Sequence, residues 1–332
     1  MDIFLNIIIL ILSFIFVGIS SNIVVNSSDK VSQYTGISKT VIGFLLISLT
    51  TSLPELSVTI ISTYKGEVNL ALGNIIGSNI ANIGLVIAVP FFISVLIIFL
   101  RKQKTQELIE NLIENKRSIV IALGVSIIIP VILLALNFLN FLMYMTSYRF
   151  LGIILVILYF VISYFVLKSR EVKQINNDKG NRRNQIIKHL SLIIIGISII
   201  VISSNYLVES AISISRYIGI SELVIGAVII AIGTSIPELA ISLSAILHKH
   251  RDLALGNAAG SCFTNITLIL GILFILTTQM IDVITFYNYI IFSIILSLIL
   301  IYYVLYKHLK FPTIIVMILI YSIFIFVTLN II

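Results

Sequence analysis

Charge is scarce in this chain, and its scarcity sets the class of protein. Asp, Glu, Lys and Arg make up 11% of the 332 residues, while hydrophobic residues make up 59% and the mean hydropathy is +1.17. A soluble globular domain carries roughly 25% charged residues. The composition therefore excludes an ordinary soluble domain and predicts an integral membrane protein embedded in the lipid bilayer.

Residue types that build enzyme and metal sites are also few. The single cysteine, Cys262, excludes an intrachain disulfide, and we interpret it as a small packing residue. The four histidines fall in predicted loops or at the ends of apolar stretches; they are His189, His248, His250 and His308. Transition-metal sites and intramembrane Ser–His hydrolysis therefore lack a ligand or a base, and we predict that the protein is not an enzyme and has no cofactor.

Long apolar runs are abundant instead. Ten of them are about long enough to cross a hydrocarbon core of roughly 30 Å as helices. They cover residues 3–25, 40–63, 70–99, 118–137, 150–167, 189–208, 222–246, 253–277, 284–305 and 311–331. Continuous runs, without the alternation of a barrel strand, predict an all-α polytopic membrane protein with ten transmembrane helices. The first run lacks a basic flank and exceeds signal-peptide length, so we interpret it as a retained span.

Lysine and arginine predict the orientation of these spans. With an outside N-terminus, 18 of the 21 basic residues fall in inner loops, and only Lys65, Arg149 and Arg216 fall in outer loops. This is a positive-inside pattern. It places both termini outside. It also accounts for the net charge of +7 without a nucleic-acid partner, because the charges flank spans in short loops.

The chain contains one segment twice, at an offset of 183 residues. Ser20–Leu85 and Ser203–Leu268 share 29 of 66 residues without a gap. The polar segment 168–188, which we interpret as a basic cytoplasmic linker, separates a five-span half (1–167) from a second (189–332). Because five is odd, the second half must be inverted relative to the first. Inverted repeats are typical of secondary transporters, with ion sites near mid-membrane where the repeats meet.

Each copy carries a glutamate inside a hydrophobic span. The first reads Thr51-Ser52-Leu53-Pro54-Glu55 and the second Thr234-Ser235-Ile236-Pro237-Glu238. A charge at mid-bilayer costs about 2.5–3.5 kcal/mol on insertion scales, so such a residue indicates function. The proline removes a backbone donor and opens the helix beside hydroxyl groups and a carboxylate. Calcium and sodium prefer such oxygen ligands.

A second motif follows each glutamate at the same spacing. It is GNIIGSNIAN at Gly73–Asn82 and GNAAGSCFTN at Gly256–Asn265. The glycines lie four residues apart and permit close helix approach. Asn74, Ser78 and Asn82, with their mates Asn257, Ser261 and Asn265, form polar stripes on one helix face. These stripes line either an interhelical hydrogen-bond seam or a cation path that faces the carboxylates.

These motifs resemble the calcium/cation antiporter superfamily, and in particular its sodium/calcium exchanger branch of prokaryotic type. That branch carries two inverted alpha-repeats, which correspond here to residues 41–85 and 224–268. The resemblance implies antiport by alternating access. It also implies that Glu55 and Glu238 hold calcium together with Thr51 and Thr234. Flanking sodium ions would add Ser78, Ser261 and the carbonyls of Ser48 and Ala231, with Asn82 and Asn265 lining the central position.

The chain departs from the family pattern at two positions. Thr50 stands where the first motif usually has glycine, and Asn265 stands where prokaryotic members often have aspartate. Three other functions stay open at this point. A proton/calcium antiporter typically has glutamate in the second motif, where this chain has Gly77-Ser78 and Gly260-Ser261. A potassium-coupled exchanger carries an acid at the position of Asn265. A cation channel would need a ring of ligands around an axial pore. No obligate protein partner is evident.

Overall fold

The computed structural model describes residues 3–100, 116–138, 145–168, 182–218, 225–279, 286–306 and 311–330. Within these ranges the regular structure is helical, without a strand. The loop predicted at 101–115 and most of the predicted linker, residues 169–181, lie outside the described residues.

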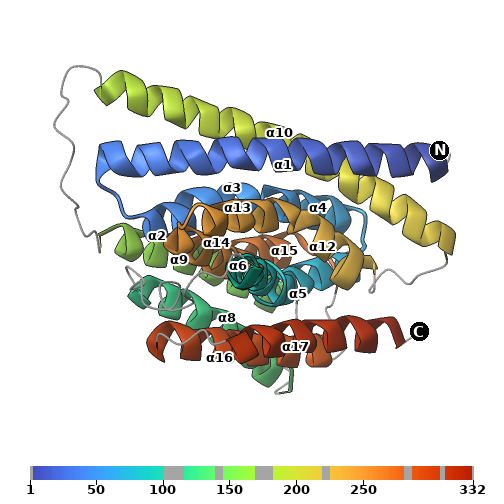
Figure 1. Cartoon of the computed structure of the whole chain (residues 1–332). Helices are drawn as coiled ribbons and strands as arrows, with labels where there is room; N and C mark the ends of the chain where they lie inside the picture. Colours follow the sequence, from blue (N-terminus) through green and yellow to red (C-terminus); the bar gives the residue numbers. More distant parts are fainter. Residues whose placement is uncertain are drawn as a thin grey trace.

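The first half of the chain begins with one long helix and continues through a broken one (Figure 1). Its elements are α1 (Ile3–Thr35), α2 (Lys39–Val41), the π-helix η1 (Ile42–Ile47), α3 (Ser48–Thr51), α4 (Leu53–Tyr64), α5 (Val68–Gly84), α6 (Ala88–Leu100), α8 (Lys116–Phe138) and α9 (Met145–Lys168).

The second half repeats this order from another long helix. Its elements are α10 (Arg182–Ile218), the π-helix η3 (Ile225–Ile230), α12 (Ala231–Thr234), α13 (Ile236–Leu247), α14 (Arg251–Thr264), the π-helix η4 (Asn265–Ile269), α15 (Leu270–Leu276), α16 (Tyr287–Tyr306) and α17 (Phe311–Asn330).

Within the described residues, each predicted apolar stretch is almost entirely helical. Among the described residues, seven helical segments are long and apolar enough to cross a membrane, and α12 with α13 forms an eighth that bends by 48°. The two remaining predicted stretches fall in α1 and α10, which are 33 and 37 residues long. The prediction of an all-helical, multi-span membrane protein is confirmed. The apolar stretch 70–99 divides into α5 and α6.

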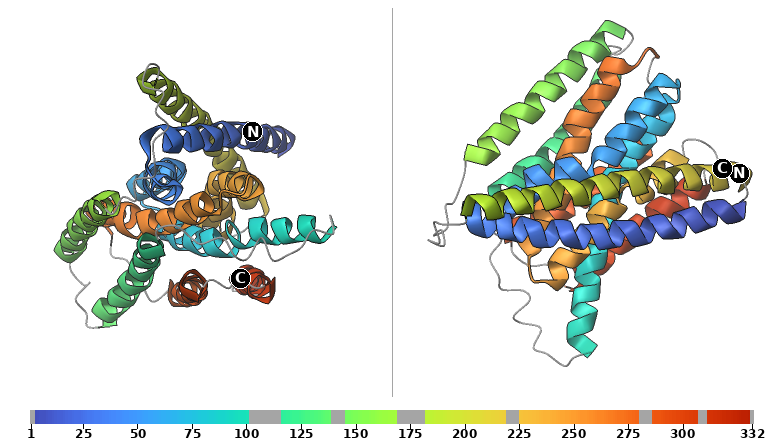
Figure 2. Two further views of the ribbon diagram at one scale, coloured as in Figure 1. Left: turned by 60° about the vertical axis from the view of Figure 1, so that its left-hand side comes forward. Right: turned by 90° about the horizontal axis from the view of Figure 1, so that it is seen from above.

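The helices form three layers that enclose the broken segments (Figures 1 and 2). α1 and α10 lie side by side over α3, α4, α12 and α13, whereas α16 and α17 cover the opposite side. Between them lie α5 and α14, whose residues are almost all buried. The centre of the molecule is therefore built from the two repeated segments.

Small and polar side chains pack α1 against α10 at seven-residue intervals. This stripe, which we call the α1–α10 seam, consists of Asn6, Ser13, Ser20 and Ser27 on α1 and Gly196, Ser203 and Ser210 on α10. A Cβ atom on Gly196 would lie 2.8 Å from Val24 Cγ2 on α1, so the helices approach too closely for a larger residue there.

The two ends of the molecule bring together different groups of loops. Both chain ends lie at one end of the molecule, and the end of α9 and the start of α10 lie at the other (Figure 1). Lys39 Nζ lies 2.9 Å from His250 Nδ1, which joins two loops predicted on the inner side. Gly66, beside Lys65 in a predicted outer loop, lies against the side chain of Gln279.

Candidate functional site

Both predicted helix breaks are present, and they have the same shape. Ser52 separates α3 from α4 with φ −82° and ψ 7°, and Ser235 separates α12 from α13 with φ −83° and ψ 3°. Pro54 and Pro237 occupy the first turn of the following helix, where a missing N–H costs little. The π-helices η1 and η3, at the 183-residue offset, precede the breaks.

The two breaks place a carboxylate in the first turn of α4 and of α13. Glu55 and Glu238 are fully buried, and they are close enough to interact electrostatically. Neither oxygen of Glu55 has a hydrogen-bond partner within the described structure, and neither does Oε2 of Glu238. Oε1 of Glu238 accepts bonds of 3.4 Å from Ser52 Oγ and Ser261 Oγ. Buried carboxylate oxygens without partners are costly unless a cation or proton joins them.

Threonine hydroxyls join the two halves through a symmetric pair of hydrogen bonds. Thr51 Oγ1 donates to Asn257 Oδ1 at 3.4 Å, and Thr234 Oγ1 donates to Asn74 Oδ1 at 3.2 Å. These pairs are related by the same 183-residue offset. Thr234 also lies beside the carboxylate of Glu55, and Thr51 beside that of Glu238. Each carboxylate is therefore flanked by a hydroxyl from the opposite half.

The remaining predicted ligands lie in the same buried region. Ser78 Oγ is 3.3 Å from Thr234 Oγ1, which adds a third residue to that end of the site. The carbonyl of Ser48 accepts a bond from Ser52 N, and that of Ala231 accepts one from Ser235 N. The Ala231 carbonyl keeps a second lone pair for an ion, whereas the Ser48 carbonyl also accepts a bond of 3.3 Å from Thr51 Oγ1. That hydroxyl has a second acceptor in Asn257 Oδ1, so turning toward it would free the Ser48 oxygen. Every predicted site residue is at most 1% exposed, so this conformation is closed to solvent.

Beside Asn265 lies a residue that sequence reasoning missed. Asn265 Nδ2 donates to Asn79 Oδ1 at 3.1 Å, which leaves Asn265 Oδ1 without a partner in the described structure. Asn82 has no partner there for either amide atom. Asn79 was overlooked because its repeat mate is Cys262, whose thiol lies 3.8 Å from the Asn79 carbonyl. The available signal was its position three residues before Asn82, on the same helix face.

Glycines allow α14, which carries the second motif of the second half, to lie directly on the broken helix of the first half. A Cβ atom on Gly256 would lie 2.5 Å from the carbonyl oxygen of Thr40, and one on Gly260 would lie 2.5 Å from that of Phe44 and 2.6 Å from Ser48 Oγ. α14 therefore packs backbone to backbone against α2, η1 and α3. This approach brings Asn257, which follows Gly256, within hydrogen-bond distance of Thr51.

The donor set is suited to a hard cation. It consists of two carboxylates with neutral hydroxyl, amide and carbonyl oxygens, which calcium and sodium prefer. Among the described residues, no group of three or more His, Cys, Asp and Glu side chains could hold a metal ion. Both halves of the chain contribute oxygen atoms to this buried site.

Comparison with known proteins identifies the family. The profile described as "Sodium/calcium exchanger protein" matches residues 5–168 and 188–330, which is most of the chain. The chain belongs to the sodium/calcium exchanger family. It is thus a membrane transporter of the cation/calcium exchanger type and not an enzyme.

Two curated relatives align with most of this exchanger-family chain. The sodium/calcium exchanger MaX1 of Methanosarcina acetivorans is 27% identical over 315 residues, which cover 80% of this chain and 82% of MaX1. The putative antiporter CaxA of Alkalimonas amylolytica is 29% identical over 278 residues, which cover 81% of this chain and 82% of CaxA.

A solved structure shares the fold. The sodium-calcium exchanger NCX_Mj, soaked with 100 mM Na⁺ and 10 mM Sr²⁺, superposes with a TM-score of 0.75 over 97% of this chain and 98% of its own, at 24% identity. At that identity the likeness establishes the architecture alone.

Proposed function

We propose that this exchanger-family protein is a sodium/calcium antiporter that works by alternating access. The observation that carries the proposal is the pair of fully buried carboxylates, Glu55 and Glu238, with unpartnered oxygens where the two halves of the chain meet. MaX1 supports the choice of ions, because it is named a sodium/calcium exchanger and aligns along most of the chain.

The proposed ion positions follow the contacts around the carboxylates. Calcium takes Glu55 and Glu238 with the hydroxyls of Thr51 and Thr234, because each hydroxyl lies beside the carboxylate of the opposite half. Sodium takes the two flanks, at Ser78 with the Ser48 carbonyl and at Ser261 with the Ala231 carbonyl, while Asn82 and Asn265 face the central position.

Charge compensation explains why this site exchanges ions and does not leak. Two carboxylates neutralise one calcium ion, or two of three sodium ions, whereas the empty dianion has no compensation in a low-dielectric interior. The loaded site can therefore be carried from one side to the other more readily than the empty one. Each calcium movement is then tied to a return movement with sodium.

The halves 1–167 and 189–332, with the linker 168–188 on the inner side, form the two inverted units of the proposed mechanism. The symmetric bonds from Thr51 to Asn257 and from Thr234 to Asn74 support this division, because each joins the broken helix of one half to the facing helix of the other. We propose that the protein lies in a prokaryotic plasma membrane with both termini outside.

Uptake of calcium-45 into sealed proteoliposomes tests the coupling ion. The vesicles are loaded with sodium, potassium or acidic buffer, and the membrane potential is either clamped or left free. We expect an outward sodium gradient to drive uptake without potassium. We also expect uptake to respond to voltage, since three sodium ions exchanged for one calcium ion move one net charge.

The other outcomes distinguish the remaining functions. Uptake that follows a pH gradient and ignores sodium would show a proton/calcium antiporter. An absolute need for potassium would show potassium-coupled exchange. We do not expect this result, because Asn265 is a neutral amide where potassium-coupled exchangers carry an acid. Uptake that needs no counter-ion gradient would show a channel.

A further inference from the structure

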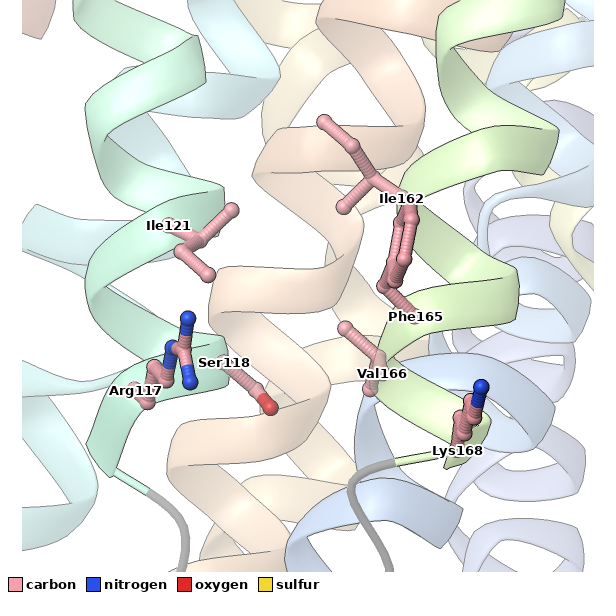
Figure 3. A pocket seen from close by; sticks show the side chains of 7 residues that line it. All are labelled: Arg117, Ser118, Ile121, Ile162, Phe165, Val166 and Lys168. Atoms are coloured by element: carbon pink, nitrogen blue, oxygen red, sulfur yellow. The ribbon is translucent and has the colours of Figure 1, made fainter.

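A cleft opens between α8 and α9, away from the proposed ion site. Its volume is about 500 Å³, and its lining consists of Arg117, Ser118, Ile121, Ile162, Phe165, Val166 and Lys168 (Figure 3). α8 packs against α14, and α9 packs against α15, so the segment α14–η4–α15 forms the floor between them. The cleft therefore faces outward from the helix bundle.

One end of the cleft is cationic and the rest is apolar. Arg117 lies in the first turn of α8 and Lys168 is the last residue of α9, so both exposed cations lie at the same end (Figure 3). Ile121, Ile162, Phe165 and Val166 form the walls above them. The cationic end is the one predicted to lie on the inner side of the membrane.

The surroundings of the cleft explain this division. α8 and α9 contain apolar spans of 21 residues each, Lys116–Leu136 and Tyr148–Lys168, so their outer faces meet lipid tails. Phe165 is 62% exposed and Ile121 is 38% exposed, so both side chains are accessible to a lipid tail. Arg117 and Lys168 stand where the tails end and the headgroups begin. A ligand that matches the whole cleft has an apolar chain and an anionic head.

We propose that this cleft binds one anionic phospholipid of the inner leaflet, with its phosphate between Arg117 and Lys168 and an acyl chain along Ile121, Ile162 and Phe165. Basic pockets between transmembrane helices on the cytoplasmic side bind anionic headgroups in this way. A soluble phosphate satisfies the cations but leaves the apolar walls unused. The bound lipid connects α8 to α9 and presses both against the α14–η4–α15 floor.

Native mass spectrometry of the purified full chain tests the binding. The protein is titrated with phosphatidylglycerol or with phosphatidylcholine of the same acyl chains. We expect one phosphatidylglycerol to bind preferentially. In the variant Arg117→Gln/Lys168→Gln its affinity should fall about 30-fold, since each basic residue near an anionic headgroup contributes about fivefold. The matched control is Arg183→Gln/Lys188→Gln, which removes two exposed cations of the predicted inner side from α10, outside the cleft.

A second pair of variants tests the apolar wall. Phe165→Ser should weaken phosphatidylglycerol binding about tenfold, whereas Phe160→Ser, on an exposed face of α9 outside the cleft, should not. Equal binding of the two lipids to the wild type would overturn the proposal. Equal loss in the α10 control would overturn it as well. Displacement of the lipid by millimolar inorganic phosphate, with no effect of Phe165→Ser, would show a soluble-anion site. A dimer mass with an unlipidated cleft would show that a second copy covers this face.

Discussion

In the proposed mechanism, transport depends most directly on Glu55 and Glu238. Each is buried in the first turn of a helix, and three of the four carboxylate oxygens have no hydrogen-bond partner in the described structure. We expect Glu55→Gln or Glu238→Gln to reduce calcium exchange at least about 100-fold, because a buried divalent ion then loses one of its two compensating charges. The folded protein should survive, since an amide removes a buried charge and adds none.

Calcium-45 uptake by the purified variants, with size-exclusion chromatography to establish folding, checks this expectation. The matched control is Glu209→Gln, which alters an exposed carboxylate on α10. Full calcium-dependent uptake by either site variant would disprove the assignment of two carboxylates.

We expect Asn79 to influence the site by orienting the side-chain amide of Asn265. It accepts the amide N–H of Asn265, which leaves the oxygen of that amide free to face an ion. We expect Asn79→Ala to raise the sodium concentration for half-maximal exchange about fivefold, the worth of one typical hydrogen bond. The calcium concentration for half-maximal uptake should change much less.

The repeat mate of Asn79 supplies the control. Cys262→Ala removes a buried side chain of similar location that makes no bond to Asn265. Equal effects of Asn79→Ala on both ions would indicate general loosening of the helix, and a parallel effect of Cys262→Ala would indicate the same.

Among the elements, the contact of α14 with α2, η1 and α3 depends on glycine. A methyl group on Gly260 would meet the Phe44 carbonyl and Ser48 Oγ, and a backbone carbonyl cannot rotate away. We expect Gly260→Ala to destabilise the protein by about 1–3 kcal/mol, as overpacking does. The melting temperature in detergent measures it.

Gly124 offers a matched substitution in another helix. A Cβ atom there would meet nothing within 4 Å, and the residue lies inside α8. Gly124→Ala should therefore stabilise the helix by about 0.5–1 kcal/mol. The prediction for Gly260 fails if the two substitutions change the melting temperature alike.

The helices also show which features of the fold can be predicted from the sequence. Pro54 and Pro237 predict the two breaks, because proline removes a backbone donor wherever it stands. The π-helices η1 and η3 were not predicted, since an altered hydrogen-bond register leaves no mark in side-chain polarity. The division of stretch 70–99 had a signal in Pro90, which cannot bond to the carbonyl of Val86 at the turn between α5 and α6.

The residues of the candidate site could be predicted from the sequence, but their pairing could not. Its carboxylates and hydroxyls follow from the duplication and from the cost of charge in a membrane. The exchange of partners between halves, Thr51 with Asn257 and Thr234 with Asn74, needed the structure. Side chains from distant segments meet only through tertiary packing, which one repeat read alone does not reveal.

At the scale of the whole molecule, the sidedness is open to direct measurement. We expect single cysteines at Lys65 and at the chain ends to react with an impermeant reagent outside, and one in the segment 168–188 to be protected. A Cys262→Ser background avoids labelling of the native thiol. An externally reactive linker would contradict the inverted arrangement of the halves.

In the proposed alternating-access mechanism we expect α1 and α10 to move as a pair, because they pack against each other more extensively than either packs on the remaining helices. Ser244 Oγ on α13 bonds to Asn22 Oδ1 on α1 at 2.7 Å, which connects the pair to the core. We expect a covalent link between cysteines at positions 22 and 244 to stop exchange, and a link between cysteines at 20 and 196 to preserve most of it.

Uptake before and after crosslinking, with reduction to restore activity, checks the result in the Cys262→Ser background. Activity retained with the link at 22 and 244 would show that α1 does not move relative to α13. Activity lost with the link at 20 and 196 would show that the seam itself must slide.

The single native thiol can report how often the protein opens. Cys262 is fully buried beside the Asn79 carbonyl at the central position, and it is the only cysteine in the chain. We expect a thiol reagent to reach Cys262 during excursions that open the proposed ion pathway, so that the labelling rate counts those excursions. Measured against sodium and calcium concentration, that rate reports how often each ion lets the pathway open, without a fluorophore or an engineered residue.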